Sequence, residues 1–362
     1  MRVLPAEMCV HLAGGTANDF VALRRKFGWH AEYFQQPPTA LADLRLRLAP
    51  RRIERLNELR DLRRVGEELA RCAQLGVRLV SWRHDGYPAP LRHLPQPPLV
   101  LGVLGRWPVP PAAISIVGAR AATAYGRQAT LRLAGAATRA GFAVVSGLAR
   151  GIDRFALEAA LAEDGWPVAV LGCGLDVVYP PEHAELQRAI VARGTLVSEF
   201  PLGQEPDRYT FPRRNRVIAA LARSVLVVEA GQRSGALITV DHALEIGRDV
   251  LAVPGPIDSD SSQGTNRLIF DGAQPVLDEA GLLHLLGAHD AAAAEAAAGA
   301  PGDGGPRRLL AALGSRALSL DELADAARLE VGAVRAGLIA LELEGQVRRV
   351  AGGRYARRLP GG

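Results

Sequence analysis

Six short apolar runs, separated by helical patterns and glycine-rich loops, constrain the fold of this chain more than any other feature. Runs that are apolar without alternation are typical of strands buried on both faces, as in a parallel sheet covered by helices. The intervening helical patterns include residues 125–141, 182–194 and 236–247. The sequence therefore predicts an α/β domain with a Rossmann-like parallel sheet. The runs are ISIVG, AVVSG, VAVLG, TLVSEF, SVLVVEA and DVLAVPG, which begin at Ile114, Ala143, Val168, Thr195, Ser224 and Asp249.

A helical, arginine-rich pattern precedes this domain and predicts a small helical domain over residues 1–79. Its arginines are typical of a solvated helix face. The proline-rich segment 76–105 that follows is expected to fold onto the α/β core, which we place at residues 80–287. The helical pattern depends on apolar residues that recur at helical spacing with charges between them, namely Leu56, Leu59, Leu62, Val65 and Leu69.

The last part of the chain has the pattern of a winged helix-turn-helix over residues 306–362, behind a flexible Ala/Gly/Pro-rich linker at 288–305. Three short helical patterns precede a basic hairpin pattern, VRRVAGGRYARR, with its turn at Gly352-Gly353. Winged helices bind DNA and also serve as protein-interaction modules, and the arginines of this hairpin favour nucleic acid. The third helix carries one apolar stripe, formed by Val331, Val334, Leu338 and Leu341.

Composition excludes some classes of protein. The formal net charge of +5 permits a polyanionic partner without requiring one. Cys9, Cys72 and Cys173 lie far apart with no histidine at ligand spacing, which argues against a disulfide framework and a metal site. No apolar run reaches the roughly 18 residues of a membrane helix, so we expect no membrane span and a cytoplasmic location.

The loops after the six strands share glycines, hydroxyl groups and arginines. Ligands of open parallel sheets bind beyond the carboxyl ends of the strands, and glycine lets backbone N–H groups approach a phosphate closely. Neither GxGxxG nor GxxxxGK[ST] is present, and Arg120 stands where a nucleotide cofactor's pyrophosphate would need room. We therefore predict a phosphodiester strand as the ligand, with no cofactor.

The segment FPRRNRVIAAL places three guanidinium groups and an amide ahead of an apolar helical run. Cations at a helix N-terminus oppose the helix dipole. Arg213, Arg214 and Arg216 therefore either point into water or share an anion with the helix terminus, together with Asn215.

No convincing catalytic set is present. Asp153 follows RGI at a helix start, where capping is its more common role. Ser146 and Ser234 have no histidine at relay spacing. Glu199 and Glu229 end strands, and each is either a base or the partner of a nearby arginine. Four aromatic residues in or beside the same loops either pack in the core or stack the bases of a single strand, namely Tyr125, Phe155, Tyr179 and Phe211.

Seven segments, in this order and with this spacing, resemble the DNA-processing protein A (DprA/Smf) family: SIVGARAATAYG, VVSGLARGID, AVLGCGLDVVYP, SEFPLG, FPRRNRVIAAL, VVEAGQRSGALIT and VPGPIDSDSSQGTNRLI. The resemblance implies a bacterial protein of natural transformation and competence, which binds incoming single-stranded DNA, protects it and loads the RecA recombinase onto it without being an enzyme. It also implies an extended Rossmann-like core that forms a homodimer, flanked by a SAM-like helical domain and a winged helix.

The resemblance further implies a DNA-binding pocket, to which the arginines of FPRRNR belong. Two departures from the family pattern stand beside it. Many relatives carry a DNA-contacting lysine after GLDVVYP, whereas residues 181–183 read PEH here, so that contact is lost or passes to His183 or Arg188. The family's histidine after RGID is replaced by Leu157. The implied pocket residues are Gly118, Arg120, Ser146, Gly147, Arg150, Gly151, Arg213, Arg214, Asn215, Arg216, Ser234 and Gly235.

Two alternatives stay open. A nucleotide-processing enzyme of the phosphoribohydrolase type has a related core, but its PGGxGTxxE signature is not matched by EAGQRSGALITVDHALE, which places Glu245 differently. In the second alternative the winged helix is the only DNA-contacting part and the core is a scaffold.

Overall fold

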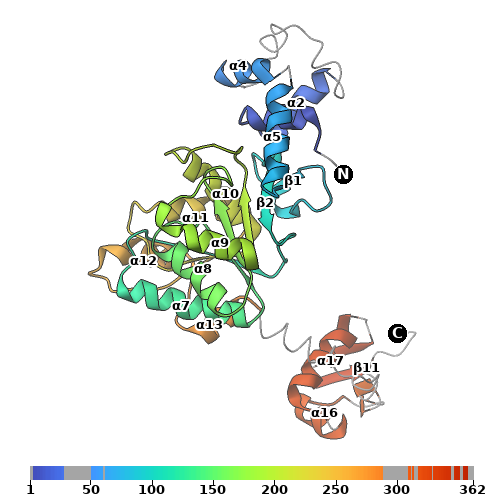
Figure 1. Cartoon of the computed structure of the whole chain (residues 1–362). Helices are drawn as coiled ribbons and strands as arrows, with labels where there is room; N and C mark the ends of the chain where they lie inside the picture. Colours follow the sequence, from blue (N-terminus) through green and yellow to red (C-terminus); the bar gives the residue numbers. More distant parts are fainter. Residues whose placement is uncertain are drawn as a thin grey trace. The chain divides into compact units, whose positions relative to one another are not determined.

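The structure is a computed structural model in which two compact units are distinguished, Met1–Leu282 and Leu283–Gly362. Each is described by itself (Figure 1). The linker predicted at 288–305 lies outside the described residues, and the boundary predicted at residue 79 stays a prediction. The described residues are 3–27, 50–59, 62–287, 309–310, 312–313, 317–327, 329–343, 346–350 and 354–357.

Within the described residues, the first unit is built on a nine-stranded sheet of order β1-β2-β6-β5-β4-β3-β7-β8-β9. The run from β6 to β9 is parallel. This confirms the predicted α/β core, because each of the six apolar runs forms one of its strands. These are β3 (Ala113–Val117), β4 (Ala143–Ser146), β5 (Pro167–Leu171), β6 (Thr195–Ser198), β7 (Ser224–Val227) and β8 (Asp249–Ala252).

The proline-rich segment folds onto the core as predicted, but its place at the edge of the sheet was not predicted. β1 (Arg78–Ser81) and β2 (Val100–Gly105) come from the proline-rich segment and pair antiparallel, with β2 against β6. They cover the edge that β6 would otherwise leave open. A short helix, α6 (Ala89–Arg92), lies between them in the chain, and β9 (Gln274–Pro275) forms the opposite edge beside β8.

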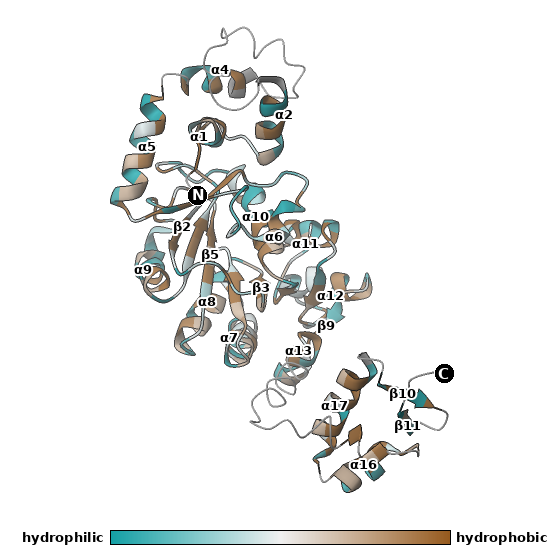
Figure 2. Cartoon of the chain, turned by 90° about the vertical axis from the view of Figure 1, so that its right-hand side faces the viewer, coloured by the Kyte–Doolittle hydropathy of each residue, from teal (hydrophilic) through white to brown (hydrophobic). Residues whose placement is uncertain are grey.

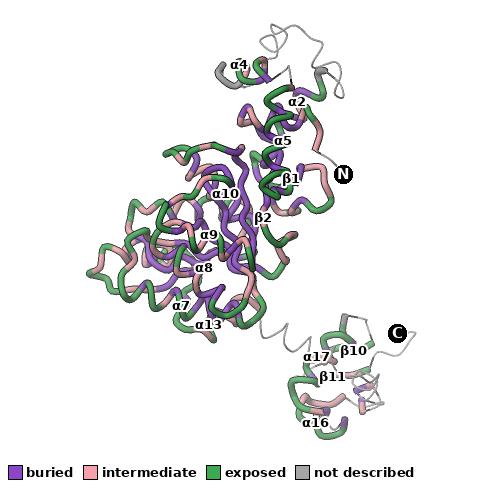
Figure 3. The backbone as a smooth tube through the Cα atoms, in the orientation of Figure 1, coloured by how far each residue is buried: buried purple, intermediate pink, exposed green. Residues whose placement is uncertain are grey.

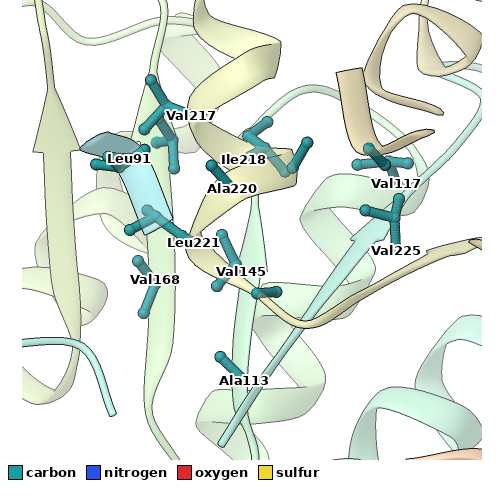
Figure 4. Close-up of a cluster of buried hydrophobic side chains, with 14 of the residues drawn as sticks. Leu91, Ala113, Val117, Val145, Val168, Val217, Ile218, Ala220, Leu221 and Val225 are labelled. Atoms are coloured by element: carbon teal, nitrogen blue, oxygen red, sulfur yellow. The ribbon is translucent and has the colours of Figure 1, made fainter. Parts of the chain in front are cut away.

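Helices cover both faces of the sheet, which explains why the strands are apolar throughout. Along β5, Val168 and Val170 belong to a core that includes residues of α10 and α11, whereas Ala169 and Leu171 pack with residues of α8 and α9. Figure 3 shows the buried strands between more exposed helices, and Figure 4 shows the α10 side of this core. The helices are α7 (Ala124–Arg139), α8 (Ile152–Ala162), α9 (Ala184–Arg193), α10 (Thr210–Leu221), α11 (Ala236–Glu245), α12 (Gln263–Phe270) and α13 (Glu279–Leu285).

The N-terminal helices pack on β2. Leu56, Leu59 and Val65 are buried together with Val100 of β2, as their helical spacing predicted. The pattern is broken into two helices because Leu62 has φ 59°, a left-handed conformation that cannot continue a helix. Figure 2 shows apolar and polar residues alternating around α4 and α5. The helices are α1 (Pro5–Leu12), α2 (Ala17–Phe27), α4 (Pro50–Glu58) and α5 (Arg63–Gln74).

The second unit contains α16 (Leu320–Ala327), α17 (Val331–Leu343) and the antiparallel pair β10 (Val347–Val350) and β11 (Arg354–Arg357). Of the predicted stripe, Val334, Leu338 and Leu341 are buried. Val331 is 41% exposed, because it begins α17 ahead of the turn that packs on the core. The predicted turn at Gly352-Gly353 lies outside the described residues.

None of the helices in the described part of the chain combines the length and apolar composition that a membrane span requires. The cysteines are free, buried thiols, and burial raises the pKa of Cys9 and Cys72 to about 12.

Candidate nucleic-acid interface

A cleft of about 780 Å³ opens at the carboxyl edge of the sheet. The strand order reverses at β3, since β4, β5 and β6 continue to one side of it and β7 and β8 to the other. Loops diverge at such a point and leave a crevice in which ligands of open α/β sheets bind. Gly118 and Arg120 after β3, Ala149 after β4, Phe211 in α10 and Ser234 after β7 all line the cleft.

Two of the predicted glycines allow the loops of the cleft to meet. Gly151 has φ +74°, and a Cβ there would lie 2.2 Å from the carbonyl oxygen of Ala119. A Cβ on Gly118 would lie 2.6 Å from Cγ1 of Ile152. The loops after β3 and β4 are therefore packed against each other, and any larger residue would push them apart.

Asp153 holds the loop after β4 in place. It lies in the first turn of α8, and its Oδ2 accepts hydrogen bonds from the backbone N–H groups of Gly147 (3.1 Å) and Ala149 (3.4 Å). Burial raises the pKa of this carboxyl, and the guanidinium of Arg214 opposes the rise. Asp153 is therefore not the predicted N-terminal cap, a position that Gly151 occupies; its carboxylate binds the loop ahead of the helix instead.

Glu229 holds the loop after β3 in a similar way. Its carboxylate accepts hydrogen bonds from the backbone N–H of Thr123 (2.9 Å) and from the Thr123 hydroxyl (2.5 Å). A Cβ on Gly126 would lie 1.9 Å from Glu229 Oε2. Glu229 was predicted to be either a base or the partner of an arginine. These contacts fit neither role, because the carboxylate fixes the start of α7.

Arg214 lines the cleft but makes its hydrogen bonds inside the protein. It is 4% exposed, and its Nη1 donates to the carbonyl oxygens of Gly147 and Val170. Burial lowers the pKa of Arg214 to about 10, although Asp153 favours its charged form. Arg214 therefore positions the loop after β4 and adds a positive charge at the wall of the cleft.

Arg213 and Arg216 are not among the cleft-lining residues, and here the structure differs from both alternatives for these side chains. Arg213 Nε lies 3.0 Å from Glu199 Oε2, and Arg216 Nη2 donates to the same oxygen. The second Arg216 amine donates to the carbonyl oxygen of Gln96, and Arg213 Nη1 donates to that of Gly14 (3.2 Å). Because α10 already begins at Thr210, Arg213 and Arg216 are neighbours three residues apart on one side of the helix, whereas Arg214 points to another side. Glu199 is thus an arginine partner.

The predicted polar residues also divide into one that is buried and two that line the cleft. Ser146 is buried, and its hydroxyl donates to the carbonyl oxygen of Ile116 (2.6 Å), so it does not reach the cleft. Asn215 lines the cleft and donates from Nδ2 to the Gly235 carbonyl oxygen (3.3 Å), while Ser234 Oγ accepts from the Ala236 N–H (3.3 Å). The Asn215 contact joins α10 to the start of α11 along one wall, and the Ser234 contact is local to that start.

Arg120 is the exposed cation of the cleft that has no internal partner. Among the described residues it forms no hydrogen bond and no ion pair, and its guanidinium lies 5.1 Å from the ring centroid of Phe211. Phe211 in turn lies 5.4 Å from the Tyr179 ring. Of the other aromatic candidates, Phe155 has its ring centroid 5.3 Å from the Arg127 guanidinium. The Tyr125 hydroxyl donates a hydrogen bond to the carbonyl oxygen of Pro254.

Arg150 and Gly147 line a smaller indentation of about 20 Å³ that shares Arg120 and Phe211 with the cleft. Arg150 forms an exposed ion pair with Glu182, one of the residues that stand where relatives carry the lysine.

The contact of that lysine does not pass to His183. The imidazole ring of His183 is buried, and its Nδ1 lies 3.0 Å from the Leu148 carbonyl oxygen. Arg188 is exposed and lies 4.0 Å from Glu185.

The sequence reasoning missed the charged cleft residues Asp207 and Arg208. Both lie in the loop PLGQEPDRYTFPRRNR, between β6 and the arginines of α10. The available signal was this charged pair directly ahead of α10. It was overlooked because the sequence pattern placed the start of the helix after the arginines, whereas α10 begins at Thr210.

Together the fold and the site define an α/β protein with a winged-helix unit and a basic, aromatic-edged cleft at the switch point of a parallel sheet. Residues 78–287 match the family model described as DNA recombination-mediator protein A, and residues 292–353 match the DprA winged helix domain. The chain belongs to the DprA/Smf family of DNA-processing proteins.

Three relatives show the extent of the similarity. Protein Smf of Synechocystis sp. is 37% identical over 312 residues, which cover 75% of this chain and 78% of that protein. The X-ray structure of DNA processing protein A from Streptococcus pneumoniae has a TM-score of 0.66 at 30% identity and covers 78% of this chain and 98% of that chain. DNA processing protein A from Helicobacter pylori, whose structure addresses its single-stranded DNA binding mode, has a TM-score of 0.53 at 28% identity, with 58% and 95% covered. The phosphoribohydrolase alternative gains no support from these matches.

Proposed function

We propose that this protein binds single-stranded DNA in the cleft at the carboxyl edge of its sheet and acts as a recombination mediator without catalysing a reaction. One observation carries the proposal: Arg120 is exposed in the cleft over an aromatic ring and has no hydrogen-bond or ion-pair partner among the described residues. Such a cation is available to a phosphate, and the half-buried ring beneath it lines the same cleft. Family membership and the binding mode of the H. pylori relative support the same ligand.

The predicted pocket residues then divide into two groups. Arg120, Arg150 and Arg208 supply exposed positive charge, and Phe211 supplies a ring surface. The remaining predicted residues shape and position the loops, among them the buried Ser146, Arg214 and Arg216. The carboxylates of Asp153 and Glu229 hold loop starts, which is why we assign neither of them to catalysis.

The test is fluorescence anisotropy of the full chain with a labelled oligo-dT strand, titrated at several salt concentrations, with the matched duplex for comparison. We expect a preference for the single strand, and we expect Arg120→Ala to weaken binding and to lower the salt slope by about 1. Arg139→Ala is the matched control, because Arg139 is exposed in the last turn of α7, at the opposite edge of the sheet. Equal affinity of Arg120→Ala and wild type would reject the cleft as the site and favour the winged helix.

We further propose that the protein loads RecA onto the bound strand. The assay is RecA strand exchange on DNA coated with single-strand-binding protein, with and without this protein. The expected result is a stimulation that Arg120→Ala reduces. A stimulation that does not depend on Arg120 would show that loading uses another site.

A homodimer is the remaining part of the proposal. Phe270 ends α12 and Leu277 follows the edge strand β9, and these apolar side chains are 80% and 78% exposed. Exposed apolar side chains that belong to one patch mark interaction surfaces, and we propose that these two side chains belong to the dimer interface. Analytical ultracentrifugation of wild type, Phe270→Asp and Leu277→Asp tests this edge, with dissociation of both variants as the expected outcome.

A further inference from the structure

We infer that Tyr209 forms a base-stacking platform at the mouth of the cleft, outside the pocket proper. This inference rests on the proposed function and extends it from phosphate binding to a nucleobase subsite. Tyr209 lies between Arg208 and Phe211, which both line the cleft, yet its own side chain is 68% exposed. An aromatic ring is therefore held outward next to a basic cleft.

The backbone that carries this ring is fixed. Asp207 Oδ1 accepts hydrogen bonds from the N–H groups of Tyr209 (2.6 Å) and Thr210 (2.8 Å). In return, the Thr210 hydroxyl accepts from the Asp207 N–H (3.0 Å). Asp207 and Thr210 thus hydrogen-bond each other in both directions across the turn that precedes α10. These hydrogen bonds fix the turn at the start of α10 before any ligand binds.

The ring itself is also oriented. The Arg208 guanidinium lies 4.7 Å from the ring centroid, and its Nη2 donates to the Tyr209 hydroxyl oxygen (2.6 Å). A cation at one side of the ring and a hydrogen bond to its hydroxyl restrict how the ring can turn. The large exposed fraction shows that much of the ring surface stays open to solvent.

A nucleobase fits this open surface better than a phosphate does. The ring has a π-face and no positive charge of its own, and stacking on a tyrosine accepts every base. Arg208 keeps the site positive, so a phosphate that flanks the stacked base is attracted to the same place. Phe211 lies two residues further on in the helix, and residues two apart do not face each other. Tyr209 and Phe211 would therefore contact different bases.

The experiment uses the full chain and fluorescence anisotropy with two labelled strands of equal length, oligo-dT and the same backbone with abasic sites throughout. We expect Tyr209→Ala to weaken oligo-dT binding at least about fivefold, since one stacked base contributes at least this factor. Tyr209→Phe should retain wild-type affinity, because the ring remains. The salt slope should stay that of wild type, because no cation is removed. On the abasic strand Tyr209→Ala and wild type should bind equally.

Leu244→Ala is the matched control. Leu244 is 61% exposed, but it lies near the C-terminal end of α11, away from the carboxyl edge of the sheet. Wild-type affinity of Tyr209→Ala for oligo-dT, or an equal loss on both strands, would overturn the platform. If Arg120→Ala weakens binding and Tyr209→Ala does not, only the platform fails. If Arg120→Ala binds normally, the cleft itself fails.

Discussion

Replacing Arg216 by methionine separates the internal role that the structure gives this residue from the DNA-contacting role that its motif predicts. The side chain of Arg216 is 7% exposed and that of its partner Glu199 is 2% exposed. Arg216→Met leaves the Glu199 carboxylate with Arg213 alone and removes the donor to the Gln96 carbonyl oxygen. Removing one member of a buried ion pair costs about 3–5 kcal/mol, and here the only cation left beside the buried Glu199 among the described residues is Arg213, whose side chain is 30% exposed.

The assay is urea unfolding and thermal unfolding of the full chain. A loss of this size corresponds to a decrease in Tm of roughly 6–20 °C at about 2–4 °C per kcal/mol. Arg120→Met is the control, since an exposed substitution changes the free energy of unfolding by less than about 0.5 kcal/mol. At a temperature where every variant is folded, Arg216→Met should keep the salt slope of DNA binding, whereas Arg120→Met should lower it.

Glu199→Gln completes the comparison. It removes the charge of the shared carboxylate. The summed losses in unfolding free energy of Arg216→Met and Glu199→Gln should exceed the loss of the double variant, because the two groups contact each other. An Arg216→Met protein that unfolds like wild type and binds DNA more weakly would refute the reasoning. That result would mean that Arg216 reaches the ligand after all.

Three other perturbations have definite outcomes. Glu182→Gln should raise affinity for oligo-dT about twofold to fivefold in anisotropy, because it frees the exposed Arg150; a gain that persists fully in an Arg150→Ala background would contradict this. Gly147→Ala should destabilise the protein by about 1–3 kcal/mol in urea, since a Cβ there would lie 2.5 Å from Nη2 of the buried Arg214; unchanged stability would contradict the packing. Burial lowers the pKa of His11 to about 4. The unfolded chain therefore binds the extra proton first as pH falls, and about 2 kcal/mol of stability should be lost between pH 7.5 and pH 5. His11→Leu should flatten this pH dependence, and an equal slope in wild type and variant would exclude His11 as its source.

The sheet was predictable because its signal is local. Each strand from β3 to β8 is a continuous apolar run, and burial on both faces is the physical cause of that continuity. The segment of β1 and β2 also reads as a short strand and an apolar run, but their antiparallel pairing at the sheet edge is set by partners distant in the sequence. The register of Gly102 against Ser198 is one example.

The cleft was predictable as a place but not residue by residue. The switch-point rule and the glycine-rich loops located it, and Arg120 lies in it with no described partner. The sequence does not show which arginines are neutralised internally, because Glu199 lies 14 residues from Arg213 and meets it only through the fold. The sequence also does not show that a Cβ on Gly147 would meet Arg214 or that one on Gly151 would meet the backbone of Ala119 and Arg120.

Helix α10 links these observations, because successive side chains on it serve different parts of the molecule. Arg213 and Arg216 tie it through Glu199 to β6, and Arg213 also reaches Gly14 of the N-terminal helices. Arg214 ties it to the loop after β4, and Asn215 ties it to the loop before α11. These contacts fix the first turns of α10 from several sides, and this fixed segment carries Phe211 and the neighbouring Arg208, which line the cleft. A mutation in the N-terminal helices that breaks the Gly14 contact would therefore act on DNA affinity through α10 without touching DNA.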